Sequence, residues 1–186
     1  MWRVLLVILL GSCTTSKDVA VEFYDKAKQY ESDLYVFLNV SFTTRGTKDN
    51  KPFIPRLEIA LSETESIMLP GIDSKMSDDE IKASPFFDNM AKYAEATHLP
   101  DSIAYEAVKR YCIDIVDLAQ KLEVYKIQST PRLGKFIIFT LSDNDEIIYA
   151  PDLSSVRTNY WKEFFKSGET LGKNWYLRNA SSINVK

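Results

Sequence analysis

The side chains best suited to nucleophilic, acid–base or metal chemistry are few in this chain. Its 186 residues hold two cysteines, Cys13 and Cys112, and a single histidine, His98. Catalytic zinc sites and Ser-His-Asp hydrolases usually draw on several histidines, or on one buried beside a nucleophile. His98 follows a predicted helix, where we expect a capping or surface residue. The composition therefore gives little support to either reaction class.

No short motif defines a reaction. The sequence contains no glycine-rich phosphate loop, CxxC pair, HExxH or GxSxG. Ser77 to Glu80 matches a helix capping box, in which serine and glutamate satisfy each other's backbone donors. Asp143 and Asp145 lie at a predicted hairpin tip and lack the further oxygens that calcium requires. We therefore predict no catalytic residue, metal site or cofactor, although paired carboxylates of the glycosidase type cannot be located from one sequence.

The first thirteen residues, MWRVLLVILLGSC, follow the order of a secretory signal peptide. Arg3 supplies a positive start, Val4–Leu10 is an unbroken apolar run, and two small residues precede Cys13. As a helix this run covers roughly 10 Å, against a bilayer core of roughly 30 Å. It is too short to span a membrane as it stands.

The segment Leu10-Gly11-Ser12-Cys13 resembles the lipobox of bacterial lipoproteins, in which leucine stands three places before the cysteine and small residues lie between them. The resemblance covers the leader only, and we identify no family for the rest of the chain. It implies cleavage before Cys13, a thioether-linked diacylglycerol on the Cys13 sulfur, and acylation of the new amino terminus. Several acyl chains, at ~0.8 kcal/mol per buried methylene, anchor a protein firmly. The alternatives are an ordinary cleaved signal peptide or a buried apolar strand with an incidental cysteine.

The leader also bears on location and on domain organisation. Thr14 follows Cys13, so the aspartate that resembles an inner-membrane retention signal in some diderm bacteria is missing. This favours the outer membrane if the host has one, and it leaves the leaflet open. We predict a cleaved signal peptide over 1–12, the lipidated cysteine and a short tether over 13–17, and a single globular domain over 18–186. A tether of this length reaches roughly 15 Å when extended.

The rest of the chain has the composition of a folded domain. It is rich in aromatic residues and contains no repeat or low-complexity segment. The net charge is −3, and the absence of a dense Lys/Arg cluster argues against a nucleic-acid partner. The basic segment 154–186 either faces anionic lipid or an acidic partner, or complements the acidic remainder of its own domain. With Cys13 lipidated, Cys112 is the only thiol left, and beside an apolar helical stripe it should act as a small hydrophobe.

Apolar periodicity predicts an α+β fold, with helices packed on one mainly antiparallel sheet that is concentrated in the C-terminal third. Expected helices cover 18–33, 85–96 (capped by Ser84), 101–122, and a short segment that Ser154 or Ser155 caps and Gly168 ends. Expected strands cover 57–61, 124–128, 135–141, 146–149 and 173–178. Residues 35–61 stay ambiguous, since the alternation from Val36 to Phe42 fits a strand while the preceding spacing fits a longer first helix.

Trp161 and Tyr176 form a candidate binding surface. Paired aromatic rings can provide a platform for a sugar or a peptide, whereas core packing is the usual role of aromatics at such spacings. Both interpretations remain open from the sequence.

Three classes of function remain. The first is a membrane-anchored bacterial envelope lipoprotein that is a non-catalytic binding or inhibitory module for an envelope or extracellular partner. The second is an envelope hydrolase that uses scattered carboxylates, and the third is an assembly or scaffold lipoprotein. The lack of catalytic motifs favours the first, in which the partners are the membrane, through lipid on Cys13, and an envelope protein. Whether the chain catalyses a reaction stays open.

Overall fold

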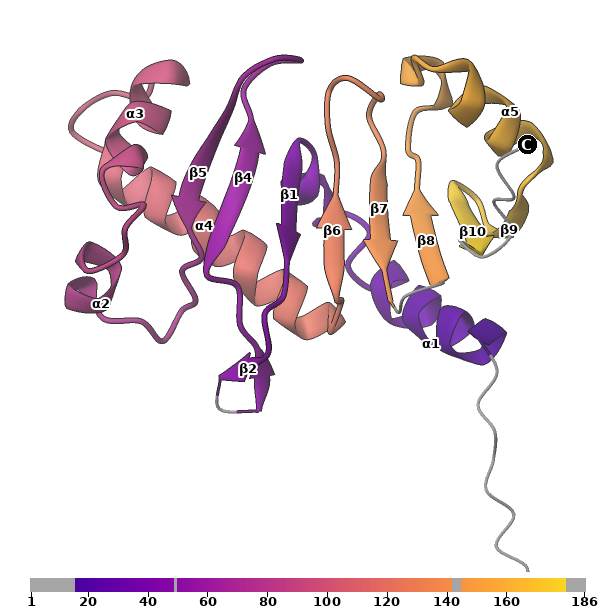
Figure 1. The fold of residues 1–186 in the computed structure, drawn as a ribbon, viewed down its shortest axis with the longest axis horizontal. Coiled ribbons are helices and arrows are strands. Elements are labelled where there is room, and N and C mark those ends of the chain that lie inside the picture. Colours follow the sequence, from indigo (N-terminus) through magenta and orange to yellow (C-terminus); the bar gives the residue numbers. More distant parts are fainter. Residues whose placement is uncertain (1–15, 49, 142–144, 180–186) are drawn as a thin grey trace, which may run out of the picture.

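The computed structural model describes residues 16–48, 50–141 and 145–179. Within these ranges the chain forms an eight-stranded sheet in the order β5-β4-β1-β6-β7-β8-β10-β9, and all its neighbouring strands are antiparallel (Figure 1). Helices pack on both faces, so the predicted α+β class is confirmed. The predicted signal peptide, Cys13 and the first residues of the tether lie outside the described residues.

The α-helices are α1 (Ser16–Lys28), α2 (Asp78–Lys82), α3 (Asn89–Ala96), α4 (Ala104–Leu122) and α5 (Asn159–Ser167), and the 3₁₀-helices are η1 (Leu34–Phe37) and η2 (Leu153–Ser155). The strands of the main sheet are β1 (Val40–Thr43), β4 (Arg56–Ala60), β5 (Ser66–Pro70), β6 (Lys126–Gln128), β7 (Ile137–Thr140), β8 (Asp145–Tyr149), β9 (Glu169–Gly172) and β10 (Trp175–Asn179). A small ladder pairs β2 (Thr47–Lys48) with β3 (Lys51–Pro52). Five strands of the main sheet follow α4, as the C-terminal concentration predicted.

One face of the sheet is covered along most of its width. In Figure 1, α4 crosses behind the strands from β5 to β6, and α1 lies behind β7 and β8. Ile115 and Leu122 of α4 are buried in one cluster with Val40 of β1, Leu57 of β4 and Phe139 of β7. Alternate strand residues point to this face, because successive side chains of a strand point to opposite sides. The main core of the domain therefore lies between the sheet and these two helices.

The opposite face is covered over only part of the sheet. A second apolar cluster joins α5 to β7, β8 and β10, and it includes Ile138, Ile148, Trp161, Phe165 and Tyr176. This explains why the strand around β7 is apolar on both faces, since it lies between two cores. Over β1, β4 and β6 the same face carries polar side chains that are partly or fully exposed.

The ambiguous stretch 35–61 does not extend the first helix. Instead α1 ends at Lys28, η1 follows, and β1 pairs antiparallel with β4. The strands β5 and β9 were not predicted, and both are edge strands of the sheet. An edge strand carries ladder hydrogen bonds on one side only and needs no strict alternation of buried side chains.

Two predicted helix N-caps are wrong and one is confirmed, and the helix predicted from Asp101 begins at Ala104. Ser84 accepts a hydrogen bond from the Phe86 backbone, but the chain then turns, and α3 begins at Asn89, whose side-chain amide donates to the Met68 carbonyl at 2.8 Å. Thr158, not Ser154 or Ser155, caps α5. The capping box that starts α2 at Ser77 has both expected hydrogen bonds.

Thr140 of β7 supplies a test of the packing. Its side chain is 9% exposed, and its hydroxyl has no hydrogen-bond partner within the described part of the chain. A buried hydroxyl of this kind costs about 1–3 kcal/mol. Thr140→Val keeps the β-branched shape, so we expect a rise of about 1 kcal/mol in the free energy of unfolding, measured by urea denaturation. The exposed Thr170→Val serves as the control, with a change within about 0.5 kcal/mol. A lower free energy of unfolding for Thr140→Val, with that of Thr170→Val unchanged, would contradict the prediction.

Candidate functional site

A row of polar side chains crosses three strands on the face that α5 leaves uncovered. Ser41 of β1 pairs with Glu58 of β4 on one side and with Gln128 of β6 on the other. Their sequence neighbours Phe42, Leu57 and Ile127 point into the main core. Strand alternation therefore directs the row away from the core and toward solvent.

A second row, two residues further along the strands, carries most of the positive charge. Thr43 of β1 pairs with Lys126 of β6, and the β1–β4 register, when continued, places Arg56 on the other side of Thr43. Arg45 follows β1, where its backbone N–H donates to the Phe53 carbonyl at 3.0 Å. This hydrogen bond holds the start of the β2–β3 hairpin beside the entry to β4.

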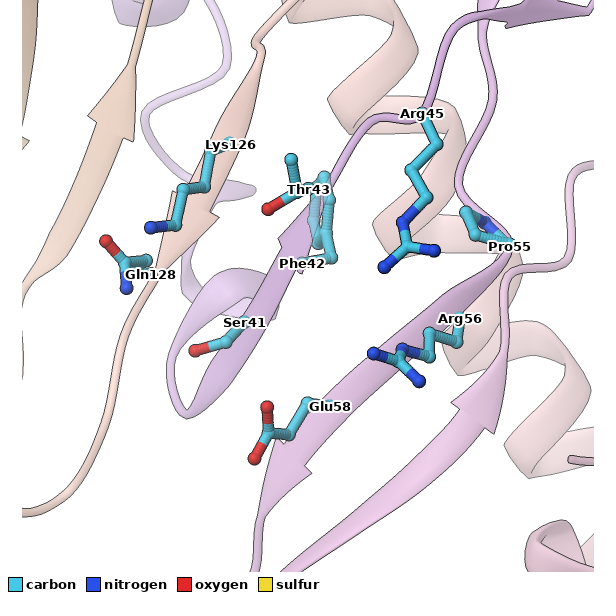
Figure 2. Close-up of a pocket in the computed structure, with 9 residues that line it drawn as sticks. All are labelled: Ser41, Phe42, Thr43, Arg45, Pro55, Arg56, Glu58, Lys126 and Gln128. Atoms are coloured by element: carbon cyan, nitrogen blue, oxygen red, sulfur yellow. The ribbon is translucent and has the colours of Figure 1, made fainter. Parts of the chain in front are cut away.

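These two rows line a depression of about 200 Å³. Figure 2 shows the guanidinium groups of Arg45 and Arg56 directed into the same region, with Lys126 and Gln128 on the far side of the β1 residues. Within the described residues, Arg45, Arg56 and Lys126 make no side-chain hydrogen bond or ion pair, whereas the Glu58 carboxylate accepts a hydrogen bond from the Ser66 hydroxyl at 3.0 Å. Three cations thus face one carboxylate, on a chain whose net charge is −3.

On the covered half of the sheet, two charged side chains are paired with each other. Beyond Lys126 the second row continues through Thr140 and Glu146 to Arg178. Arg178 binds Glu146 through Nε at 2.6 Å, and its guanidinium lies 4.7 Å from the centre of the Trp161 ring. Both charged side chains are mostly buried, at 16% and 13% exposed. The arginine on the covered half is therefore paired and stacked, while the cations on the uncovered half have no protein partner among the described residues.

This arrangement is suited to binding an anion. A guanidinium offers a planar fork of N–H donors that matches carboxylate and phosphate oxygens, and an ammonium adds a compact positive charge. The depression contains hydroxyl and amide groups beside these cations, and the Ser41 hydroxyl donates to the Ser129 carbonyl at 3.5 Å and not to the Glu58 carboxylate.

Trp161 and Tyr176, the aromatic pair predicted as a candidate surface, do not form an exposed platform. Their side chains are 6% and 7% exposed and belong to the second apolar cluster. The ring of Phe165 lies between them, 5.8 Å from Trp161 and 4.8 Å from Tyr176. Because α5 packs onto β10, the ring faces that a sugar or peptide would contact are already in contact with other side chains of this cluster. Cys13, the predicted lipid attachment site, lies outside the described residues.

A groove beside α3 and the start of α4 is a second candidate surface, with a volume of about 880 Å³. Its apolar lining comes from Phe87, Met90, Ala91, Ala94, Leu99, Ala104 and Tyr105, and its polar rim from Asp88, Glu95, His98 and Asp101. His98 follows α3 with a positive φ of 56° and is exposed, in keeping with a residue at a helix exit.

The acidic side chains whose pKa shifts clearly are not poised for acid catalysis. The hydrogen bond from Lys109 lowers the pKa of Asp78, the bonds from Ser77 lower that of Glu80, and those from Ser154 lower that of Asp152. Residues 16–48, 50–141 and 145–179 contain no group of three or more His, Cys, Asp or Glu that could hold a metal ion. Nor does any helix in these ranges have the length and apolar character to cross a bilayer.

The sequence did not single out the cationic residues of the depression. Alternation along β4 could have placed Arg56 on the face opposite Leu57. The sequence does not reveal that Lys126 lies two strands away from Arg56. This arrangement arises because β1 pairs with β6, which follows α4 in the chain.

Comparison of the chain with protein-family models, with curated proteins and with solved structures found no match.

Cys112 is predicted to be chemically silent in the native protein. Its side chain is fully buried, and this burial raises the pKa of the thiol to about 12. At pH 8 the thiol therefore stays protonated and inaccessible, whereas the thiolate is the reactive form. In a Cys13→Ala variant, in which Cys112 is the only thiol, we expect no reaction with Ellman's reagent at pH 8 until guanidinium unfolds the chain. Rapid labelling of the folded protein would contradict this.

Proposed function

We propose that this chain is a bacterial envelope lipoprotein, held at the membrane by lipid on Cys13, whose domain is a non-catalytic module that binds an anionic ligand on the uncovered half of the sheet. The observation that carries the binding site is the set of three cations, Arg45, Arg56 and Lys126, that line one depression with a single carboxylate, Glu58, and form no ion pair among the described residues. Three cations gathered around one depression favour an external anion, because like charges repel one another and only the Glu58 carboxylate lies among them.

The short tether would keep this domain close to the membrane. Because α1 begins at Ser16, only Thr14 and Thr15 separate it from Cys13. Even fully extended, the chain from Cys13 to Ser16 reaches about 11 Å. The domain would therefore meet ligands of the envelope itself or ligands that arrive at its surface, and an outer-membrane location applies if the host is diderm.

The two alternatives rest on different features. A hydrolase that uses scattered carboxylates would need an acid with a raised pKa facing a second acid, and in the depression Glu58 stands among three cations instead. The assembly or scaffold alternative is favoured by the α3–α4 groove, whose apolar lining and acidic rim suit a basic amphipathic helix of a partner protein.

Lipid anchoring is tested at Cys13. In bacteria fed an alkyne fatty acid, the wild-type protein should become labelled and fractionate with membranes. Cys13→Ala should abolish labelling and release the protein or leave it unprocessed, because the sulfur that carries the diacylglycerol is gone. Cys112→Ala is the matched control and should label as the wild type does. Membrane retention that survives Cys13→Ala without loss of label would overturn the anchor.

Anion binding is tested by chromatography of the detergent-solubilised protein on heparin, a polyanion. A chain of net charge −3 is retained only if its positive charge is locally concentrated. We expect Arg45→Gln/Arg56→Gln to elute at clearly lower salt than the wild type, while Lys162→Gln, at an exposed position on α5, changes elution little. Identical elution of all three proteins would remove the depression as the binding site and move the search to the α3–α4 groove.

A further inference from the structure

Resting on the proposed anion-binding function, we infer that the depression on β4, β1 and β6 is specific for a phosphorylated sugar or polyol. The inference comes from the two polar rows, which differ in charge and in the kind of hydrogen bond they offer. One row, with Arg45 beside it, would take the phosphate, and the other would take hydroxyl groups of the same ligand.

The charge of the depression matches a phosphate monoester better than a carboxylate. Arg45, Arg56 and Lys126 contribute three positive charges, and Glu58 offsets one. A phosphate monoester carries about −1.5 to −2 at pH 7, so it neutralises most of the remainder. Its three terminal oxygens can also accept hydrogen bonds from two guanidinium groups and one ammonium together. A carboxylate has two oxygens and half the charge.

The row of Glu58, Ser41 and Gln128 sets what must lie beside the phosphate. It is displaced by two residues along the strands, or roughly 7 Å. An ionised carboxylate only accepts hydrogen bonds, and so does the Ser41 hydroxyl while its O–H donates to the Ser129 carbonyl, whereas the Gln128 amide both donates and accepts. A ligand placed there needs donors for Glu58, and a second anionic group would be repelled by it. Hydroxyl groups on a ring meet both conditions.

The size of the depression limits what it encloses. Its volume of about 200 Å³ lies below the roughly 300–1,000 Å³ of sites for drug-sized ligands. It therefore suits a single phosphorylated ring, either as a free molecule or as the end group of a glycan or lipid that continues outside.

Isothermal titration calorimetry with the detergent-solubilised protein compares the affinities of four soluble probes. These are glucose 6-phosphate, inorganic phosphate, glucose and glucuronate. We expect glucose 6-phosphate to bind at least tenfold more tightly than each of the others. Arg56→Gln and Lys126→Gln should weaken it by tenfold or more, while Lys162→Gln should leave it unchanged.

The Glu58→Ala variant tests the row of Glu58, Ser41 and Gln128 independently of the cationic row. Because it removes the acceptor for hydroxyl groups and a negative charge, we expect it to reduce the preference for glucose 6-phosphate over inorganic phosphate, while phosphate itself binds equally or better. Circular dichroism would establish that each variant is folded. An unchanged preference in Glu58→Ala would overturn the role of this row.

The other outcomes distinguish this inference from the proposed function. Equal binding of glucuronate and glucose 6-phosphate would overturn the phosphate assignment and leave anion binding intact. Absence of binding by glucose 6-phosphate, inorganic phosphate and glucuronate, together with no retention on heparin, would overturn the inference and the proposed anion-binding function. Phosphatidylcholine vesicles with and without lipid A, whose headgroup is a phosphorylated disaccharide, identify the source when they are mixed with the Cys13→Ala protein, which has no acyl chains of its own to insert. Capture on lipid A alone supports a lipid-borne ligand, and competition by glucose 6-phosphate shows that the same chemistry is recognised.

Discussion

The burial of one nearly complete sheet face against α4 and α1 is the constraint on which the rest of this structure depends. The six neighbouring strands β4, β1, β6, β7, β8 and β10 each bury apolar side chains in that interface. Phe37, Phe139 and Trp175 fill it with aromatic volume. At roughly 25 cal/mol per Å² of apolar surface, this burial is the main favourable term in folding. It also fixes which residues point the other way, because a shift of one residue would turn every side chain to the wrong face.

Partial coverage of the second face then divides the sheet into a covered and an uncovered half. Over β7, β8 and β10 the helix α5 builds a second core, and the Glu146–Arg178 pair is held at its margin with the Trp161 ring. Such a pair is costly to break, since one partner would be left as an uncompensated charge. Over β4, β1 and β6 the described residues add no apolar layer, so the cationic side chains that point outward there remain exposed or partly exposed. The same strand geometry thus places an ion pair on the covered half of the sheet and three cations without an ion pair on the uncovered half.

Several elements could be predicted because their signals are local. The stripe of α4, the capping box at Ser77, the β7–β8 hairpin and the final strand β10 each depend on residues close together in the chain. The predictions that went wrong involved competition from distant segments. Asn89 begins α3 where it can reach the Met68 carbonyl of β5. For Trp161 and Tyr176 the sequence left two interpretations open, and both rings are buried because α5 folds onto β10.

The sequence by itself determined the α+β class, the position of the main helix and the expectation of a lipid-anchored leader, because periodicity and the order of the first thirteen residues are local properties. Only the tertiary structure decided where the candidate site lies. The β2–β3 hairpin separates Arg45 from Arg56 in the chain, and three α-helices separate Arg56 from Lys126. Antiparallel pairing of β1 with both β4 and β6 brings the three residues to one depression. Long-range strand pairing depends on the fit of whole surfaces, and this information is spread over the entire chain instead of residing in any one motif.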